Sequence, residues 1–561
     1  MKARLVLAGA ASLVAAGCAA GGASQVDRDL ARIRAEALRH APRPLTRAER
    51  TQYQETSRHE DVLAFLDSLV AMDGRLVRTS IGRSGEGRDL PAIVASRPRV
   101  ATPAEARALR RPVVYVQGNI HAGEVEGKEA LQMVLRDLAL DPHPNVLDSI
   151  VLVAVPIYNA DGNEKWGPQA RQRGAQNGPE TVGQRPNAAG LDLNRDYVKL
   201  EAPETRASLA AFNAWDPDVF VDLHTTNGSY HGYALTYSPS LHPAAPLGAF
   251  THDTVLPELR RRMKARRGFE TFPYGNFGAD EGIGPRQPLT DSVKTGWYTY
   301  EHKPRYGTNY YGLRGRLSVL SEAYSHDPFG RRVASTYAFV RELLSLVAER
   351  PTAARLAAAR TQTPTPARPG GAVPIRARFA PPSRQPVLVE VLTATGDSSR
   401  TEPGVPRGIR RTGRYLAQEM PVVDRFAGTL TRAIPAGGWA IDAAAPGADS
   451  AVKLLLAHGI RVTRAGSLAA TDVETFRADS VVKAARAFQG HQEVRLEGTW
   501  RTERRAHGDS FVVSADQPLA LLALLLLDPQ SDDGLATWNV FDAALRVGGD
   551  FPVTRLLVPA P

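Results

Sequence analysis

Two potential metal ligands, His121 and Glu124, lie three residues apart in the segment GNIHAGEVEGKEA (118–130). A histidine and a carboxylate at this spacing in a tight turn can point at one ion, and Gly118 and Gly123 give the backbone freedom to form such a turn. Imidazole and carboxylate groups are good zinc ligands. Because H-x-x-E also occurs in ordinary polar loops, this pair alone does not establish a metal site.

His224 supplies a third potential ligand at the end of an apolar run in DVFVDLHTT (218–226). A lone histidine in this place could also be a core histidine with satisfied hydrogen bonds. Together with His121 and Glu124, however, it completes a set of three ligands that leaves a fourth position open. Three protein ligands with one open position are typical of catalytic zinc sites, whereas structural zinc sites are closed by a fourth ligand.

Four apolar runs predict the buried strands that would position these groups. Each run is unbroken or nearly so, as expected for central strands of an α/β sheet, which are covered on both faces. Three of them end directly at polar residues, and sites in open α/β sheets collect at the carboxyl edge of the strands. The runs are Pro112–Val116, Ile150–Pro156, Val219–Leu223 and Leu317–Leu320.

The chain has 561 residues, which is long enough for two or three domains. We expect a signal peptide (1–18), a tether (19–45), a main α/β domain (46–350), a linker rich in Pro and Ala (351–386) and a smaller C-terminal α/β accessory domain (387–561).

The first residues resemble a bacterial export signal. Lys2 and Arg4 precede an apolar stretch, Leu5–Ala16, which is too short to span a membrane, and Cys18 follows it. A cysteine in this position resembles a lipobox, in which the thiol takes a lipid. The usual Leu three residues earlier is missing, so an ordinary signal peptide cut nearby is the alternative. We expect an exported protein, either secreted or held in the periplasm or outer membrane as a lipoprotein.

Composition and charge narrow the class of protein. Hydrophobic residues make up 43% of the chain and the net charge is +10. The basic residues are spread along the chain and not gathered into a block with interleaved aromatics, which argues against nucleic acid as a partner. Cys18 is the only cysteine, so neither an internal disulfide nor a cysteine zinc site can form. Any membrane contact would come through the lipid anchor.

The order of the polar motifs resembles that of the zinc carboxypeptidases of the carboxypeptidase A type. The motifs are the first His–Glu pair, then Asn194-Arg195, then His224, then Glu322 in LSVLSEAY (317–324). The resemblance covers about residues 50–345 and identifies the chain as a bacterial secreted or lipoprotein member with an appended C-terminal domain. It implies a mixed, mostly parallel central sheet with helices on both faces and one zinc ion per chain.

The resemblance also implies roles for individual residues. Glu322 matches the general base that takes a proton from a zinc-activated water. Arg195 matches the arginine that holds the terminal carboxylate of the substrate, for which the fork of a guanidinium is well suited, with Asn194 assisting. Asp192 matches a carboxylate that orients a zinc-binding histidine, His121.

Two further roles stay open between several residues. The arginine that stabilises the oxyanion could be Arg171, Arg173 or Arg185, among which we favour Arg173 as a catalytic residue. The tyrosine that closes over the substrate could come from the stretch 300–315, where we favour Tyr310 or Tyr311 as substrate-binding residues.

These inferences predict a zinc metallocarboxypeptidase that removes C-terminal residues from peptides or proteins with a free C-terminus. One alternative is a zinc amidohydrolase acting on cell-wall peptides or acylated amino acids. Another is a binding lipoprotein that has lost catalysis, against which the presence of all three ligands and Glu322 argues.

Overall fold

The computed structural model describes residues 43–141, 144–361, 372–397 and 404–558. The predicted signal peptide with Cys18, and the tether up to residue 42, lie outside the described residues. Among the described residues, no helix is both long and apolar enough to cross a membrane.

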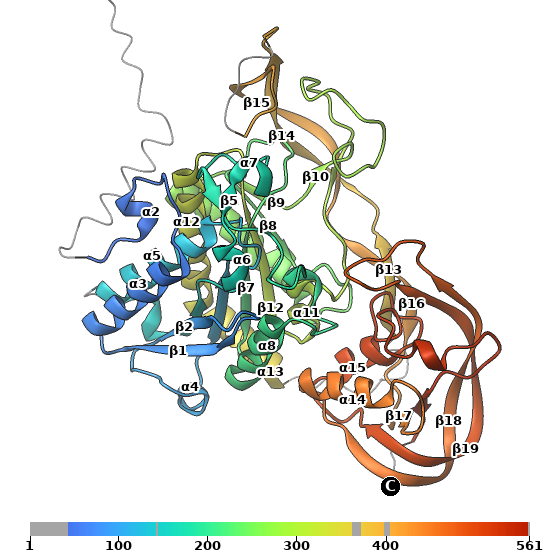
Figure 1. Ribbon diagram of the computed structural model, residues 1–561. Helices are drawn as coiled ribbons and strands as arrows, with labels where there is room; N and C mark the ends of the chain where they lie inside the picture. Colours follow the sequence, from blue (N-terminus) through green and yellow to red (C-terminus); the bar gives the residue numbers. More distant parts are fainter. Residues whose placement is uncertain (1–42, 142–143, 362–371, 398–403, 559–561) are drawn as a thin grey trace, which may run out of the picture.

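An eight-stranded sheet forms the centre of the larger domain (Figure 1). The strand order is β1-β2-β4-β3-β7-β12-β8-β9. Four of the neighbouring pairs are parallel (β4 with β3, β3 with β7, β7 with β12, β8 with β9), and the other three are antiparallel. The sheet is therefore mixed and mostly parallel, as predicted. Its strands are β1 (Leu76–Arg83), β2 (Asp89–Ala95), β3 (Val113–Gly118), β4 (Val151–Val155), β7 (Val219–Thr225), β8 (Leu235–Pro239), β9 (Thr271–Pro273) and β12 (Leu317–Ala323).

The four strands predicted from apolar runs are confirmed as β3, β4, β7 and β12. They are neighbours in the sheet and run parallel, so their carboxyl ends meet at one edge. Every residue of these strands is buried, which explains why the runs are continuously apolar up to the site.

Helices cover both faces of the sheet. Leu223 and Phe220 lie three apart in β7 and therefore point to opposite faces. An added Cβ on Gly127, in α5 (Glu126–Leu140), would lie 2.7 Å from the Cβ of Leu223. Phe220 instead packs on Tyr311 of α11 (Gly307–Leu313), with ring centroids 4.2 Å apart. On the α5 face, α3 (His59–Met72) and α12 (Phe329–Ala348) pack against α5, and α8 (Pro203–Trp215) packs with α11 on the other face.

The segment 351–386 is more regular than the predicted linker. It contains most of α13 (Arg350–Thr361), and then β13 (Val373–Phe379) and the start of β14 (Ser383–Ala394). The Ala, Leu and Arg residues of α13 are strong helix formers. The prolines of the two strands are tolerated because both strands lie at sheet edges, where a backbone N–H is dispensable.

The next two strands of the chain pair with the first domain, and the separate C-terminal unit begins only after them. β14 pairs with β15 (Ile409–Val423), which pairs in turn with β11 (Trp297–Tyr298), a neighbour of β10 (Asn276–Phe277). Residues of β14 and β15 also share a buried cluster with aromatic residues of the first domain. Strands β14 and β15 therefore pack with the first domain, although residues 387–561 were predicted to form the accessory domain.

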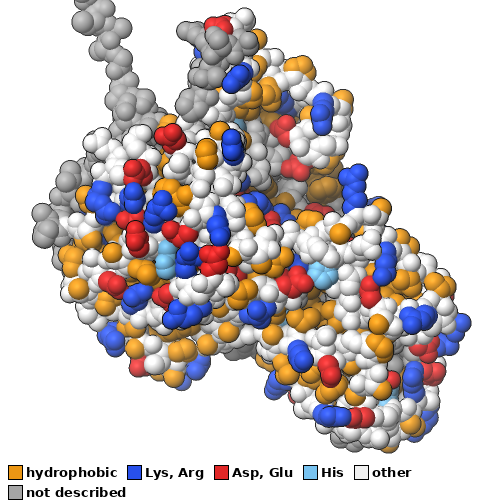
Figure 2. All heavy atoms as spheres, viewed as in Figure 1, with side chains coloured by type: hydrophobic (Ala, Val, Ile, Leu, Met, Phe, Trp, Pro, Cys, Tyr) orange, Lys and Arg blue, Asp and Glu red, His pale blue; other side chains and the backbone are white. Residues whose placement is uncertain are grey.

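The C-terminal unit is rich in strands and centred on a closed barrel. Its strands are β17 (Gly438–Asp442), β18 (Thr463–Lys483), β19 (Val494–Val513) and β20 (Val553–Leu556), and its helices include α14 (Ala448–Ala457) and α15 (Ala520–Leu527). The two-stranded sheet of β13 and β16 (Phe426–Arg432) lies between this unit and the larger domain (Figure 1). On the face shown in Figure 2, basic and acidic side chains are intermixed over both parts of the molecule.

Candidate metal centre and active site

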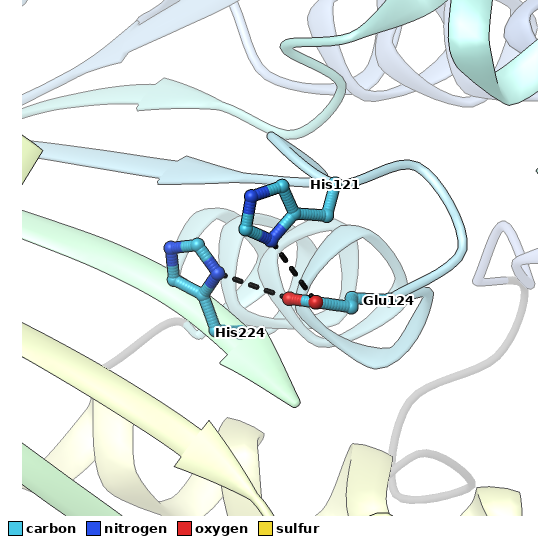
Figure 3. Close-up of side chains that lie close together, drawn as sticks. All are labelled: His121, Glu124 and His224. Atoms are coloured by element: carbon cyan, nitrogen blue, oxygen red, sulfur yellow. Dashed lines mark hydrogen bonds and ion pairs between the residues drawn. The ribbon is translucent and has the colours of Figure 1, made fainter. Parts of the chain in front are cut away.

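Three side chains converge at the carboxyl edge of the sheet. His121 follows β3, Glu124 comes just before α5, and His224 lies in β7 (Figure 3). The Nδ1 atom of His121 is 3.0 Å from one carboxylate oxygen of Glu124, and the Nδ1 atom of His224 is 3.0 Å from the other. One ligand atom from each residue lies within 4.8 Å of the other two, and all three residues are buried.

The turn between β3 and α5 owes its shape to close packing. Neither Gly118 nor Gly123 has a positive φ; Asn119 takes the left-handed conformation instead, at φ 65°. A Cβ on Gly123 would lie 2.7 Å from the side chain of Arg173, and one on Gly118 would lie 3.0 Å from the backbone of Gly127. The two glycines therefore serve close approach, and not the turn conformation that the sequence suggested.

The second nitrogen of each imidazole faces a carboxylate. Nε2 of His121 shares a hydrogen bond of 3.0 Å with Asp192, and Nε2 of His224 lies at an ion-pair distance of 3.0 Å from Asp222. Such partners fix the ring orientation of metal-binding histidines and raise their basicity. Both Nδ1 atoms are thereby directed at the same point, and the two imidazoles and one carboxylate fit a single zinc ion.

Asp222 was not predicted from the sequence. The signal for it was the D-x-H spacing within an apolar strand, because residues two apart in a strand point to the same face. Its other oxygen accepts a hydrogen bond from Gln117 at 3.2 Å. Asp192, which the resemblance implied for His121, does lie against that histidine.

Glu322 lies beside the metal ligands on the neighbouring strand. In the parallel pairing of β12 with β7, Glu322 is aligned with His224. The side chain is buried, and its Oε2 atom has no hydrogen-bond partner among the described residues. Burial raises the pKa of Glu322 to about 8, while His224 opposes the rise and Glu124 adds to it. Burial also acts to raise the pKa of Glu124, but the charges of His121 and Arg173 outweigh it and hold this pKa well below its ordinary value.

A small cavity of about 50 Å³ joins these groups to the predicted carboxylate clamp. Its lining includes the three potential metal ligands and Glu322 together with Asn194 and Arg195. The remaining lining residues are Arg185, Thr225, Asn227, Tyr274, Tyr300, Tyr306, Thr308 and Leu320.

Arg195 is held from two sides at the end of a short 3-10 turn, η2 (Leu193–Arg195). Its guanidinium lies over the ring of Tyr306, 4.1 Å from the centroid, which is the geometry of a cation–π contact. It also donates to the carbonyl of Asn194 at 2.8 Å. The side chain of Asn194 in turn accepts from the backbone N–H of Gly307 at 2.9 Å. The clamp is thus tied to the first residue of α11 and to Tyr306 just before it.

The structure separates the three arginines considered for the oxyanion. Arg173 lies 3.0 Å from Glu124 and also donates to backbone carbonyls of the strand end that follows His224. Arg185 lines the cavity and pairs with Asp192 at 2.9 Å. Arg171 is exposed in α7 (Gln169–Gln172) and does not line the cavity. Two of the three arginines therefore reach the site, and only Arg185 faces the cavity.

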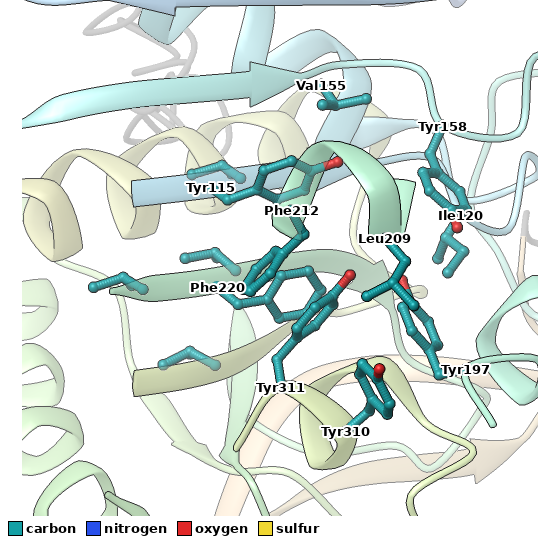
Figure 4. Close-up of a cluster of buried hydrophobic side chains, with 14 of the residues drawn as sticks. Tyr115, Ile120, Val155, Tyr158, Tyr197, Leu209, Phe212, Phe220, Tyr310 and Tyr311 are labelled. Atoms are coloured by element: carbon teal, nitrogen blue, oxygen red, sulfur yellow. The ribbon is translucent and has the colours of Figure 1, made fainter. Parts of the chain in front are cut away.

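Tyr310 and Tyr311 do not reach the site, which corrects the prediction that they bind substrate. Both are fully buried in the core between α8, α11 and the sheet (Figure 4). Tyr311 stacks on Phe212 with centroids 3.9 Å apart, and the hydroxyl of Tyr310 bonds His458 at 2.7 Å. They occupy the inner face of a helix, where burial of aromatic area stabilises the fold.

Three other tyrosines line the cavity in their place, namely Tyr274, Tyr300 and Tyr306. Tyr300 and Tyr306 had been among the residues considered in the stretch 300–315. Tyr306 precedes α11 and points out of the core, whereas its neighbours inside the helix point into it. The boundary of α11 separates the two groups, because Tyr306 is the N-cap residue with an extended backbone whereas Tyr310 and Tyr311 lie inside the helix.

Comparisons with known proteins agree with the metal site. Residues 62–266 match the family model for zinc carboxypeptidases. Carboxypeptidase 2 of Trichophyton rubrum is 28% identical over 173 residues, which are 30% of this chain and 28% of that protein. Carboxypeptidase Z of Mus musculus is 37% identical over 128 residues, which are 22% and 18% of the two chains. The chain thus spans less than a third of the length of these relatives.

Among solved structures, a metallo-carboxypeptidase from Burkholderia cenocepacia is similar over 52% of this chain and 69% of that one, with 20% identity and a TM-score of 0.38.

The mixed α/β sheet carries two histidines and a glutamate at its carboxyl edge, and this triad fits a single zinc site. The site lies within residues 62–266, the segment that is similar to the zinc carboxypeptidases. The matched region contains His121, Glu124, Arg195 and His224 but ends before β12, so the role of Glu322 depends on its position in the structure.

Proposed function

We propose that the protein is a zinc-dependent metallocarboxypeptidase that hydrolyses the C-terminal bond of peptides with a free carboxylate. The observation that carries this proposal is the shared cavity, in which Arg195 faces the same space as the metal ligands and Glu322. A cationic fork beside the reacting groups selects a substrate whose carboxylate lies one residue from the scissile bond.

Zinc bound by His121, Glu124 and His224 would polarise the scissile carbonyl and lower the pKa of a water molecule towards about 7. Glu322 accepts a proton from that water while the oxygen of the water attacks the carbonyl carbon. The same carboxyl group then gives the proton to the amine nitrogen as the C–N bond breaks. Its buried position and free oxygen suit both transfers.

Negative charge grows on the carbonyl oxygen during the attack and needs a donor in the cavity. We assign the stabilisation of this oxygen to Arg185 and not to Arg173, because Arg185 is the one of the three candidate arginines that lines the cavity. Arg173 holds Glu124 and the end of β7, so it supports the metal site from behind. Preorganised donors of this kind contribute about 10²–10³ to kcat in other acyl-transfer sites.

The test uses purified residues 19–561 and a set of chromogenic dipeptides, each with a free and an amidated C-terminus. Zinc content is measured in the same sample. We expect about one zinc per chain, cleavage that a chelator stops, and loss of cleavage on amidation. Equal cleavage of the two forms would remove Arg195 from its role, and absence of zinc would contradict the whole site.

We also propose that the protein is exported and anchored through a lipid on Cys18, which the sequence of residues 1–18 supports. A Cys18→Ala variant is then expected to move from the membrane fraction to the soluble fraction and to lose incorporation of labelled fatty acid. Equal fractionation of the variant and the parent would contradict the anchor.

A further inference from the structure

The C-terminal unit touches the two segments that build the carboxylate clamp. One segment runs from Asp192 to Glu201 and contains Arg195; the other, Glu301 to Tyr306, ends at the ring that underlies Arg195. The barrel unit lies side by side with α8 and α11, which flank these segments (Figure 1). Its contacts with these two segments come from residues 488–493 and 532–538 and from His458, which bonds the carbonyl of Val198 at 3.1 Å.

Asp533 of the C-terminal unit holds the residue before Tyr306. It accepts from the backbone N–H of Arg305 at 2.6 Å and from its Nε at 2.9 Å. Arg305 also donates to Glu493 at 2.6 Å and is only 3% exposed. A buried guanidinium must stay paired, since an unpaired buried charge is strongly unfavourable. This pair therefore fixes the backbone that presents Tyr306 to Arg195.

Trp538 makes a second connection to the clamp. Its Nε1 donates to Asp533 at 3.0 Å. Its ring contacts two cations, the guanidinium of Arg305 at 4.4 Å and the ammonium of Lys199 at 4.3 Å. Lys199 in turn donates to the backbone carbonyl of Arg195 at 2.6 Å. Cation–π contacts of this kind are strongest when they are shielded from water.

Gln489 reaches the start of the clamp turn. Its side-chain oxygen accepts from the backbone N–H of Asp192 at 2.9 Å. The carboxylate of Asp192 then accepts from the N–H of Asn194 and faces His121. Gln489 has a φ of 50°, a left-handed conformation that costs a non-glycine residue free energy unless its surroundings hold it.

We propose that the C-terminal unit positions the carboxylate clamp, through Asp533, Trp538 and Gln489, and is thus a working part of the substrate site. The inference rests on the proposed carboxypeptidase activity. The metal ligands and Glu322 stand on or next to the central strands and do not contact this unit directly in the described residues. Loosening the clamp therefore weakens binding of the substrate carboxylate and leaves the chemical step in place.

The test compares two variants of the full chain with a matched control. Gln489→Gly removes the side chain at a position whose φ suits glycine, so folding is not endangered. Asp533→Asn keeps the shape but removes the charge that pairs with Arg305. The control, Asn213→Ala, removes a contact between the same two units at Ala457, together with the bond from Arg314 to Asn213, and neither contact lines the cavity.

We expect both variants to raise KM for peptides with a free C-terminus. The rise is about 5-fold for Gln489→Gly, which loses a bond between neutral groups, and about 10-fold for Asp533→Asn, which loses a bond to a charged group. The value of kcat stays within about twofold, zinc content stays at the parent level, and the control matches the parent. An unchanged KM in both variants, or a fall in kcat at unchanged KM, would overturn the proposal.

A second measurement separates this inference from the proposed activity. Calorimetry gives the Kd of an N-acylated amino acid and of its amide for each protein. A parent that binds the free acid more tightly but cleaves nothing contradicts the proposed activity, and the same rise in Kd for the variants then still supports the positioning role. A parent that neither cleaves peptides nor prefers the acid overturns both.

Discussion

At the scale of single residues, the site contains four carboxylates that lie close together but have different roles. Glu124 meets both imidazoles, while Asp192 and Asp222 lie behind the rings. Glu322 stands apart with a free oxygen in the cavity. The surroundings of each carboxylate separate these roles. Cations around Glu124 hold its pKa low and keep it charged, whereas burial dominates at Glu322 and raises its pKa.

Replacement of Glu322 tests the general base. Glu322→Gln keeps the size of the side chain but cannot accept a proton, so kcat is expected to fall by about 10²–10⁴-fold. Zinc content is expected to stay at the parent level. Ser321→Ala is the matched control, since Ser321 neighbours Glu322 in β12 and points to the opposite face. A loss of less than tenfold in the glutamine variant would exclude Glu322 as the base.

Asp222→Asn tests the carboxylate behind His224. The variant keeps the fold of β7 but weakens the orientation of the ring, so zinc affinity is expected to fall by about 10–100-fold. Competition with a metal-sensitive dye measures the affinity directly. An affinity equal to that of the parent would show that Asp222 is not needed to orient the histidine.

At the scale of elements, α11 separates packing from substrate contact within a few residues. Tyr306, just before the helix, faces the cavity, whereas Tyr310 and Tyr311 inside it face the core. Tyr306 is the N-cap residue and has an extended backbone, so its ring does not follow the helical period that directs Tyr310 and Tyr311 into the core.

Tyr311→Phe distinguishes the two roles. The hydroxyl of Tyr311 is buried and has no hydrogen-bond partner among the described residues. Its removal is expected to leave KM unchanged and to raise the free energy of unfolding by about 1 kcal/mol, since an unsatisfied buried group is lost. Thermal unfolding and peptide kinetics check this expectation. A rise in KM as large as that of Tyr306→Ala would return Tyr311 to the substrate site.

The sequence predicted those parts of the site that are fixed locally. His121 and Glu124 share one turn, and His224 and Glu322 end or follow continuous apolar runs, so patterns of type and spacing were enough. Assignments that depend on a long loop or on helix orientation were less secure. Residues 167–190 have little periodicity, so the choice between Arg173 and Arg185 needed the cavity, and the core position of Tyr310 needed the packing of α11.

At the scale of the whole molecule, the C-terminal unit could not be placed from sequence. Its contacts with the clamp join residues far apart in the chain, such as Asp192 with Gln489 and Arg305 with Asp533. No local pattern encodes such pairs.

Removal of zinc tests how far the metal holds the fold together. Its ligands come from the β3–α5 turn and from β7, so the ion links segments distant in sequence. A ligand present at 1,000 times its Kd stabilises the native state by about 4 kcal/mol. We expect a chelator to lower Tm by several degrees and added zinc to restore it. Identical unfolding curves with and without chelator would contradict a filled site.

The pairing of β11 with β15 has a practical consequence for making the protein. Trp297 is fully buried, and its cluster includes Val387, Val389, Met420 and Val422 from the later strands. A recombinant fragment cut at residue 350 would expose this aromatic surface and leave the edge of β11 unpaired, which invites aggregation. Expression of the catalytic fold should therefore extend past residue 423, and limited proteolysis of the intact chain should spare the β14–β15 hairpin where it covers that surface.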